Sequence, residues 1–318
     1  MTPCRAPAWL PGGHAQTLWP LLIKPRPLAL RRERWTTPDD DFIDVDFLDA
    51  PAAAPLLVLF HGLEGSARSH YAIAAARACQ RRGWRLALPH FRGCSGELNR
   101  QPRSYHAGDA AEIDWILRRL SRMNGGQPLH AAGVSLGGNA LLKWAGEQGE
   151  AAAKVVTGVA AICPPLNLAA CSRQLALGFN RIYTQNFIGT LKQKAAAQLD
   201  RFPGLFDRQR MLAARTLYDF DDAVTAPLHG FAGAEDYWAR AAAKPWLAAI
   251  GVPALVLNPL NDPFLLPRYL PTAAEVSPPV RLEQPAEGGH VGFVSGAFPG
   301  NLDWLPQRLL HFFIHQTS

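Results

Sequence analysis

The segment Gly133-Val134-Ser135-Leu136-Gly137 holds the residue types that most directly suggest chemistry in this chain. It follows an apolar run, residues 129–134, and precedes a helix-forming run, residues 139–147. A Gly-x-Ser-x-Gly between a strand and a helix predicts a turn so tight that both flanking positions need a very small residue. Such a turn lifts the serine hydroxyl off the sheet. The segment therefore predicts a nucleophile at Ser135, and a Gly-rich turn without a catalytic role is the alternative.

A serine of this kind needs a base to take its proton and a carboxylate to hold that base. The base is usually a histidine, and the carboxylate fixes its tautomer. After an elbow of this type, the acid and then the histidine follow the serine along the chain. Asp262 comes just after a predicted strand at 254–257, and His290 lies between a predicted strand at 280–282 and the last predicted helix. We therefore expect Asp262 as the acid and His290 as the base.

Other residues compete for these two roles. Asp221, Asp222 and Asp236 are candidate acids, but they fall within or at the end of a long insertion between strands. His311 and His315 also follow Asp262, but they lie in the last helix and the C-terminal tail. For Asp262 itself the alternative is a turn residue before proline.

The carbonyl that the serine attacks becomes an oxyanion, which backbone amides stabilise. One donor is expected to be the N–H of Leu136, directly after the nucleophile, and the second the N–H of Leu63, in the loop that follows His61-Gly62. Glu64 is interpreted as a solvated loop carboxylate. Cys94 is interpreted as a small loop residue, since nothing in the sequence pairs its thiol with a base.

The chain alternates strands with helices, which predicts a parallel sheet with helices on both faces. Two histidines in Gly-containing loops, His14 and His106, are candidates for lining the pocket. Residues 1–30 are rich in Pro and Trp and are expected to be irregular. The predicted strands are 42–48, 56–60, 85–88, 129–134, 155–162, 254–257 and 280–282, and the predicted helices are 70–82, 110–123, 139–147 and 302–315.

Residues 166 to about 245 break this alternation and are expected to form a helical cap within a single domain spanning residues 1–318. They lack strand patterning but hold helical stretches at 190–199 and 208–217. Packing of the cap on the core explains most of their aromatic residues, and together these residues make an apolar pocket plausible. The aromatic residues are Phe179, Tyr183, Phe187, Phe202, Phe206, Tyr218, Phe220, Phe231, Tyr237 and Trp238.

The composition describes a compact globular protein, with 48% hydrophobic and 18% charged residues among 318. The formal charge of +6 has no dense basic stripe beyond residues 24–34, so no nucleic-acid partner is expected. Weak peripheral contact with an anionic membrane is compatible with this charge. The oligomeric state does not follow from the sequence.

The five cysteines are widely spaced and form no Cys-x-x-Cys pair, so neither a disulfide framework nor a metal site is expected. Residues 1–9 contain two prolines and no continuous apolar run, so we expect no signal peptide and a cytoplasmic location. No run approaches the 18 apolar residues that would span a bilayer.

Five segments resemble the YheT-like branch of the α/β-hydrolase superfamily, which also includes the plant EMB8-type and animal ABHD-type lipid hydrolases. They are Trp9-Leu10-Pro11-Gly12-Gly13-His14-Ala15-Gln16-Thr17, His61-Gly62-Leu63-Glu64-Gly65-Ser66, Phe91-Arg92-Gly93-Cys94-Ser95-Gly96, 133–139 and 288–293. The resemblance implies an α/β-hydrolase fold, a Ser135–Asp262–His290 triad and an ester hydrolase without a cofactor. It also implies that residues 92–96 form a structural loop. Where the family commonly has two aspartates before proline, this chain has Asn261-Asp262, so Asp262 alone can carry the charge.

We therefore expect a serine hydrolase that cleaves carboxylic esters, of small molecules or of lipids, through an acyl-enzyme on Ser135. An acyltransferase with the same triad is the alternative, since only access of the second nucleophile to the pocket separates the two. A non-catalytic binding protein on a hydrolase fold is a third interpretation. Dehalogenase and epoxide-hydrolase chemistry would need an aspartate at the elbow, which Ser135 excludes. Lysophospholipase activity at a membrane surface is compatible with the aromatic cap and the basic charge.

Overall fold

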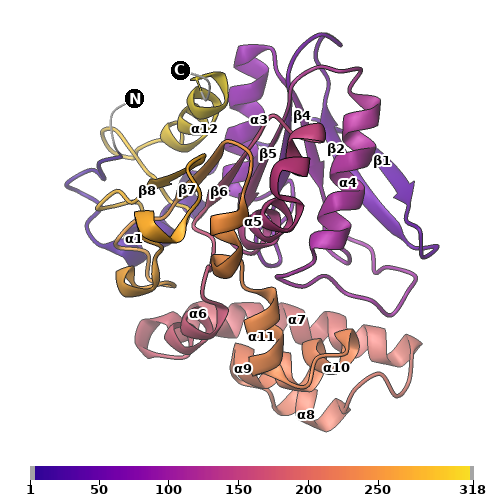
Figure 1. The fold of residues 1–318 in the computed structure, drawn as a ribbon. Helices are drawn as coiled ribbons and strands as arrows, with labels where there is room; N and C mark the ends of the chain where they lie inside the picture. The colour runs from indigo at the N-terminus through magenta and orange to yellow at the C-terminus, as the bar shows by residue number, and fades with distance from the viewer. Residues whose placement is uncertain (1–3, 316–318) are drawn as a thin grey trace.

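The computed structural model describes residues 4–315, which build an eight-stranded sheet flanked by helices (Figure 1). The strand order is β1-β2-β4-β3-β5-β6-β7-β8. The pairs β1–β2 and β2–β4 are antiparallel and all the others are parallel. The strands are β1 Arg31–Thr36, β2 Phe42–Leu48, β3 Leu56–Phe60, β4 Arg85–Pro89, β5 Leu129–Val134, β6 Gly158–Ile162, β7 Ala254–Leu257 and β8 Val280–Glu283.

The central strands are buried on both faces, which explains why they read as continuous apolar runs. Every residue of β3, β5, β6 and β7 is buried. In β3, Leu56, Val58 and Phe60 belong to one hydrophobic cluster, and Leu57 and Leu59 belong to another. The period-2 geometry of a strand thus divides the core into two layers, one on each face of the sheet.

Two helices cover each face (Figure 1). Helices α4 (Ala110–Met123) and α5 (Leu136–Gln148) contribute their apolar residues to the layer that contains Val58. Helices α3 (His70–Arg82) and α12 (Trp304–His315) contribute theirs to the layer that contains Leu57. The apolar side of each of these amphipathic helices therefore packs on one face of the sheet.

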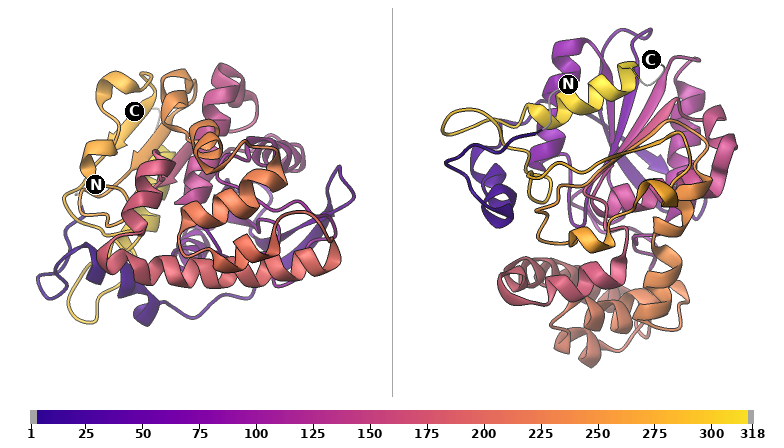
Figure 2. Two further views of the ribbon diagram at one scale, coloured as in Figure 1. Left: turned by 90° about the horizontal axis from the view of Figure 1, so that it is seen from below. Right: turned by 60° about the vertical axis from the view of Figure 1, so that its left-hand side comes forward.

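A helical insertion lies between β6 and β7, and Figure 1 shows it as a separate group of helices below the sheet. It has its own apolar cluster, in which Ile188, Met211 and Phe220 are buried. Its helices are α6 Leu168–Leu175, α7 Arg181–Arg201, α8 Arg208–Ala213, α9 Leu217–Phe220, α10 Ala226–His229 and α11 Ala234–Ala241. A π-helical turn, Asp221–Thr225, joins α9 to α10. The helices begin directly after the carboxyl end of β6, which places them beside the sheet edge where the parallel strands end (Figure 2).

Strand β1 is not among the strands predicted from the sequence, because its pairing rests on charges rather than on hydrophobic alternation. Arg32 lies opposite Asp46 and Arg34 opposite Asp44 on β2. Each arginine makes two hydrogen bonds to its carboxylate, with distances of 2.6 to 2.8 Å. Opposite charges at facing positions stabilise an antiparallel strand pair. In the sequence alone, however, a strand rich in charged residues cannot be told from an exposed loop.

Three further expectations need correction. Residues 1–30 are not wholly irregular, since they contain α1 (Gly13–Leu18) and α2 (Pro20–Ile23). The strand expected at 155–162 begins at Gly158, because residues 149–154 form a 3-10 helix. The helix expected at 208–217 ends at Ala213, and Thr216 caps the separate helix α9 by accepting a hydrogen bond from the Asp219 amide.

Candidate active site

Ser135 sits on a strained turn between β5 and α5, as its sequence context predicts. Its backbone has φ 51° and ψ −119°, a region that costs a non-glycine residue about 1–3 kcal/mol. A Cβ on Gly133 would lie 2.4 Å from the Gly137 carbonyl oxygen, and one on Gly137 would lie 2.4 Å from the His61 carbonyl oxygen. Only glycine fits at either position, so the two glycines allow the close packing that raises Ser135 above the sheet.

The structure brings Ser135, His290 and Asp262 together in one hydrogen-bonded chain. His290 Nε2 lies 3.0 Å from Ser135 Oγ, and His290 Nδ1 lies 2.8 Å from Asp262 Oδ2. The Asp262 side chain is 2% exposed and that of His290 is 11% exposed. These three residues come from the loops after β5, β7 and β8, and the carboxyl ends of parallel strands meet at one edge of the sheet.

Phe264 contacts both Asp262 and His290. Its amide donates a 2.8 Å hydrogen bond to Asp262 Oδ1, the oxygen that His290 does not use. Its ring stacks on the His290 imidazole with the ring centroids 4.1 Å apart. Asp262 thus accepts a hydrogen bond on each oxygen, and the imidazole is held between a carboxylate and an aromatic ring.

The two expected oxyanion donors flank this group. Leu136 is the first residue of α5, and Leu63 follows β3 in a loop whose Gly62 packs closely against Ser135. A Cβ on Gly62 would lie only 3.3 Å from Ser135 Cβ. Within residues 4–315 no hydrogen bond from the Leu63 amide is found, and the Leu136 amide, at the first position of α5, has no acceptor within its own helix. Both N–H groups are therefore free to meet a ligand.

His61 holds this loop as a neutral side chain. Burial lowers its pKa to about 3. Its Nδ1–H donates to the Gly62 carbonyl over 2.7 Å, and its Nε2 accepts the Phe91 amide over 3.0 Å. Since both ring nitrogens are used by backbone groups, His61 positions the loop and has no free nitrogen for proton transfer.

Glu64 is not the solvated carboxylate that the sequence analysis expected. Its side chain is 10% exposed, and Lys194 of α7 donates to it over 2.8 Å. The Glu64 amide donates to the Tyr105 hydroxyl, which in turn donates to Glu64 Oε1, both over 2.9 Å. An ion pair therefore links the helical insertion to the residue directly after Leu63. This ion pair could not be predicted from a local sequence pattern, because Glu64 and Lys194 lie 130 positions apart.

Cys94 belongs to the same cluster but is not a competing nucleophile. Lys194 Nζ lies 3.5 Å from its sulfur. Burial raises the pKa of the Cys94 thiol to about 11, although Lys194 acts in the opposite direction. A thiol with such a pKa remains protonated at neutral pH, and the thiolate is the nucleophilic form.

The remaining candidates from the sequence lie elsewhere. Asp222 and Asp236 pair with Arg210 and Arg240 within the insertion. Asp221 accepts hydrogen bonds from Trp238 and Thr225, each over 2.8 Å, and burial raises its pKa to about 6. None of the three carboxylates contacts His290, so Asp262 is the acid that the structure brings to it.

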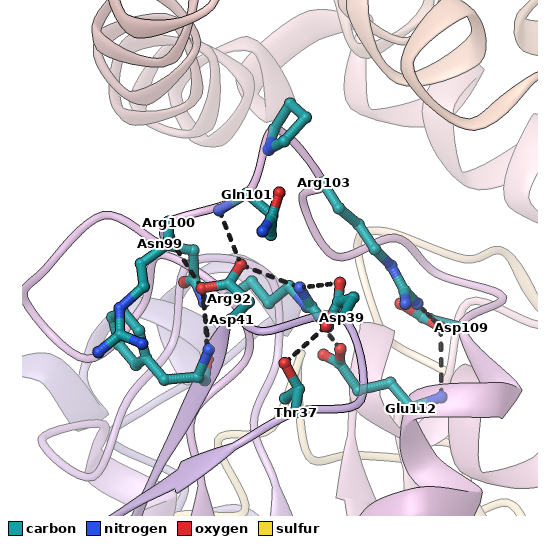
Figure 3. A network of polar contacts seen from close by, with 12 residues as sticks. Thr37, Asp39, Asp41, Arg92, Asn99, Arg100, Gln101, Arg103, Asp109 and Glu112 are labelled. Atoms are coloured by element: carbon teal, nitrogen blue, oxygen red, sulfur yellow. Dashed lines mark hydrogen bonds and ion pairs between the residues drawn. The ribbon is translucent and has the colours of Figure 1, made fainter.

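Arg92 anchors the loop that the family resemblance marks as structural (Figure 3). Its side chain is 2% exposed and pairs with Asp39, Asp41 and Glu112 at distances of 2.6 to 3.0 Å. Asp41 also accepts hydrogen bonds from the Asn99 side chain and the Arg100 amide. The network shown in Figure 3 fixes residues 92–101, which form part of the wall of the cavity above Ser135.

Helix α1 has a supporting role at the site that was not predicted from the sequence. The Gln16 side chain is fully buried, and its Oε1 accepts hydrogen bonds from Asn261 Nδ2 and the Gly288 amide, both over 2.9 Å. Thr17 Oγ1 accepts the His290 amide over 2.8 Å. One short helix therefore holds the loop of the acid and the loop of the base. The family resemblance included these residues but gave no reason for them.

A cavity opens between the sheet edge and the helical insertion, with Ser135, Leu63 and Leu136 in its wall. Its lining is mostly apolar, and the insertion contributes much of it. The polar lining includes Lys194, Asp221 and His106, whereas His14 instead places its Nδ1 3.2 Å from the Tyr183 hydroxyl. Apolar side chains from the insertion that line the cavity include Leu168, Leu175, Phe187, Leu191, Leu217, Phe220 and Val224.

Cys163, Asp262 and His290 are the one cluster of three possible metal-ligating side chains within residues 4–315. Burial raises the pKa of the Cys163 thiol well above its ordinary value, and the Asp262 carboxylate raises it further. Metal ions bind the thiolate, and His290 and Asp262 already bond to each other. The cluster therefore favours a hydrogen-bonded acid–base pair over a metal site.

The sequence matches the family described as "alpha/beta hydrolase fold" over residues 55–297. Among solved structures, an esterase from Pyrococcus furiosus superposes with a TM-score of 0.58 at 14% identity, covering 91% of this chain and 92% of that one. DcsB bound to a substrate analogue gives a TM-score of 0.60 at 14% identity, covering 91% and 99%. The chain belongs to the α/β-hydrolase family.

Similar proteins assign the chain to one branch of this family. A protein of Escherichia coli named "Putative esterase YheT" is 37% identical over 302 residues, which cover 93% of this chain and 88% of that protein. Human "Phospholipase ABHD3" is 26% identical over 315 residues, covering 96% and 76%. The spruce "Embryogenesis-associated protein EMB8" is 26% identical, covering 87% and 63%. The chain is an α/β hydrolase of the YheT-like branch.

No helix within residues 4–315 combines the length and the apolar character required to cross a bilayer.

Proposed function

We propose that this protein hydrolyses carboxylic esters, with Ser135 as nucleophile, His290 as general base and acid, and Asp262 as the residue that orients His290. The observation that carries the proposal is the continuous chain of hydrogen bonds from Ser135 Oγ through both ring nitrogens of His290 to a buried carboxylate. Esterase and phospholipase relatives support the same chemistry.

In the proposed reaction, Ser135 Oγ attacks the ester carbonyl while its proton passes to His290 Nε2. Asp262 stabilises the imidazolium that forms and remains ionised. The Leu63 and Leu136 amides donate to the oxyanion of the tetrahedral intermediate, a contribution that is worth roughly 10²–10³ in rate per donor. His290 then protonates the leaving alcohol. Water activated by the same imidazole releases the acid from Ser135.

The cavity supports an apolar acyl or alcohol group in the substrate, from a small ester or a lipid. Its apolar wall comes mostly from the helical insertion, and we propose that residues 166–245 act as the cap of the site. Apolar walls gain affinity from each buried methylene, about 0.8 kcal/mol in transfer experiments. Longer acyl chains are therefore expected to bind more tightly until the cavity is filled.

Labelling with a fluorophosphonate, which phosphonylates activated serines, tests the proposal. The wild type should incorporate one label, and Ser135→Ala should abolish it. Ser172→Ala is the matched control, because Ser172 lines the same cavity from α6 without a histidine partner, and it should label like the wild type. A folded wild type that takes no label would reject the serine-hydrolase proposal, and label retained in Ser135→Ala would assign another nucleophile.

Acyl transfer to an alcohol uses the same residues. Product analysis with and without added alcohol separates the two reactions. Free acid as the main product in both conditions supports hydrolysis, and a new ester formed in the presence of the alcohol supports transfer.

A further inference from the structure

One side of the molecule gathers large apolar side chains that face solvent. They come from α2, from the segment that precedes and begins α7, and from the loop before α12. Leu22 is 76% exposed, Phe298 70% and Leu177 61%. Six of the twelve large apolar side chains that are exposed within residues 4–315 belong to these segments. We call the set the apolar face: Leu21, Leu22, Leu177, Phe179, Ile182 and Phe298.

The three segments lie far apart in the sequence but are joined in the structure. Trp19 Nε1 donates to the Pro299 carbonyl over 2.8 Å, and the rings of Trp9 and Phe298 lie 5.4 Å apart. The ring centroids of His14 and Phe179 lie 4.7 Å apart, which joins α1 to the start of the insertion. Figures 1 and 2 show the N-terminal helices, the loop before α12 and the start of the insertion on one side in each view.

The segments that carry the apolar face contain basic residues and no acidic ones, and Asp303, which directly follows the last of them, pairs with Arg81. Residues 5–30, 176–190 and 294–302 contain Arg5, Lys24, Arg26 and Arg181 and no aspartate or glutamate. All four side chains are exposed, and no ion pair to an acidic residue within residues 4–315 involves them. Glu287, which accepts the Ala6 amide, is half-buried.

We propose that the apolar face docks on an anionic lipid surface, with its apolar side chains in the headgroup region and its cations against the lipid phosphates. Exposed apolar residues rimmed by unpaired cations are the features that bind proteins to such a surface. A second copy of this chain fits less well, because a two-fold contact would bring the four unpaired cations of each copy into one interface. The proposal concerns where the protein works and does not depend on Ser135 being the nucleophile.

The face adjoins the proposed active site through α1. The same helix that carries Gln16 and Thr17, which hold the loops of Asp262 and His290, continues into α2 with its exposed Leu21 and Leu22. Docking at this face would bring lipid close to the end of α6, where Leu175 lines the cavity two residues before the exposed Leu177.

Sedimentation with vesicles tests the proposal. The wild type is mixed with vesicles of phosphatidylcholine alone and with vesicles that also contain phosphatidylglycerol. We expect measurable binding that is stronger with phosphatidylglycerol. The triple variant Leu21→Ser, Leu22→Ser, Phe298→Ser should lower binding to both by about tenfold or more. The control Met123→Ser, Leu212→Ser, Ile314→Ser removes exposed apolar side chains elsewhere and should bind like the wild type.

The double variant Lys24→Gln, Arg26→Gln should weaken binding to phosphatidylglycerol vesicles by about tenfold and leave phosphatidylcholine binding unchanged. Arg122→Gln, Lys154→Gln makes the same change in net charge at exposed positions elsewhere and should have little effect. All of these variants should keep the rate on a water-soluble ester. Ser135→Ala should still bind vesicles, which separates failure of this proposal from failure of the catalytic one.

Three results would overturn the proposal. The first is a wild type that binds phosphatidylglycerol vesicles no better than phosphatidylcholine vesicles. The second is a control variant that loses as much vesicle binding as the apolar-face or charge variant with which it is matched. The third is a dimer in gel filtration that Leu22→Ser dissociates, since it would assign the face to a second copy of the chain.

Discussion

The sheet edge and the helical insertion differ in the forces that define them. At the sheet edge, Ser135, His290 and Asp262 are fixed by short hydrogen bonds and by loops that begin where strands end. The insertion meets the same cavity mainly with apolar side chains. One ion pair, Lys194–Glu64, joins the two regions next to Leu63. Directional contacts thus define the chemistry, and packing defines the space that a substrate occupies.

The largest expected effect follows from removing the directional contacts. Ser135→Ala and His290→Ala should each lower kcat by roughly 10⁴-fold or more on an ester that the wild type cleaves, and Asp262→Asn by roughly 10³–10⁴-fold. The three losses should not add, because the residues act as a unit. Steady-state kinetics of the single and double variants measure this. Additive losses would show that the three residues act separately.

Gln16→Leu probes the support behind the sheet-edge site. It leaves the Asn261 side chain and the Gly288 amide without their acceptor, which should destabilise the fold by about 2 kcal/mol or more. Displacement of the loops should also lower kcat by about ten- to a hundredfold.

Asn124→Leu is the matched control, because Asn124 is also buried and hydrogen-bonded but lies after α4, away from the site. It should lose stability without losing kcat. Urea titration and kinetics under conditions in which both variants are folded compare the two, and equal kcat losses would remove the positioning role of Gln16.

Lys194→Met breaks the ion pair that joins the insertion to the loop beside Leu63. We expect kcat to fall about three- to tenfold with little change in KM, because Glu64 would no longer be held beside Leu63. Lys194→Arg should restore most of the rate. Lys192→Met is the control on the same helix, since Lys192 donates to the Leu212 carbonyl and interacts with Asp219, both within the insertion. An effect on KM alone would show that Lys194 binds substrate and does not position the loop.

The smallest expected effect is a pH dependence that originates in the insertion. Burial raises the pKa of Asp221 to about 6 from an ordinary value of 3.8. The folded state therefore holds this proton more tightly than the unfolded state. The stability contributed by Asp221 falls as pH rises from about 4 to about 6 and is constant above that range. Asp221 lines the cavity, which reduces the effect of its burial. We therefore expect the free energy of unfolding to fall by about 1–2 kcal/mol over this pH range.

Urea unfolding of the wild type and Asp221→Asn below and above this range measures the effect. The fall should be smaller in the variant. Asp236→Asn provides a control of opposite sign, because the Ala232 amide lowers the pKa of Asp236. Identical pH dependences for the wild type and Asp221→Asn would show that Asp221 does not titrate in this range.

The two regions also differ in how far the sequence predicts them. The central strands and α3 and α4 follow from apolar runs and helical periodicity, and the elbow, Asp262 and His290 follow from residue types placed after those strands. These features depend on local sequence. The contacts of Gln16 with Gly288 and of Lys194 with Glu64 join residues 272 and 130 positions apart, and no local pattern reports them.

Strand β1 and the break after Ala213 show the same limit at the level of elements. In β1 the pairing partners are charged, so the strand becomes visible only once β2 is placed beside it. In the insertion, Thr216 caps α9, a separate helix, whereas the residue composition predicts that α8 continues to residue 217. Hydrophobic patterning predicts the parts of the chain that are buried by the sheet. It misses the parts that specific polar pairs determine.

The most direct test of the central claim is to locate the acyl group during turnover. The protein is mixed with a p-nitrophenyl ester, quenched in acid and digested, and the acylated peptide is identified by mass spectrometry. We predict an acyl adduct on Ser135 that disappears in Ser135→Ala and persists in Ser172→Ala. Ester cleavage that continues in Ser135→Ala, or an adduct on any other residue, would contradict the assignment of Ser135, His290 and Asp262.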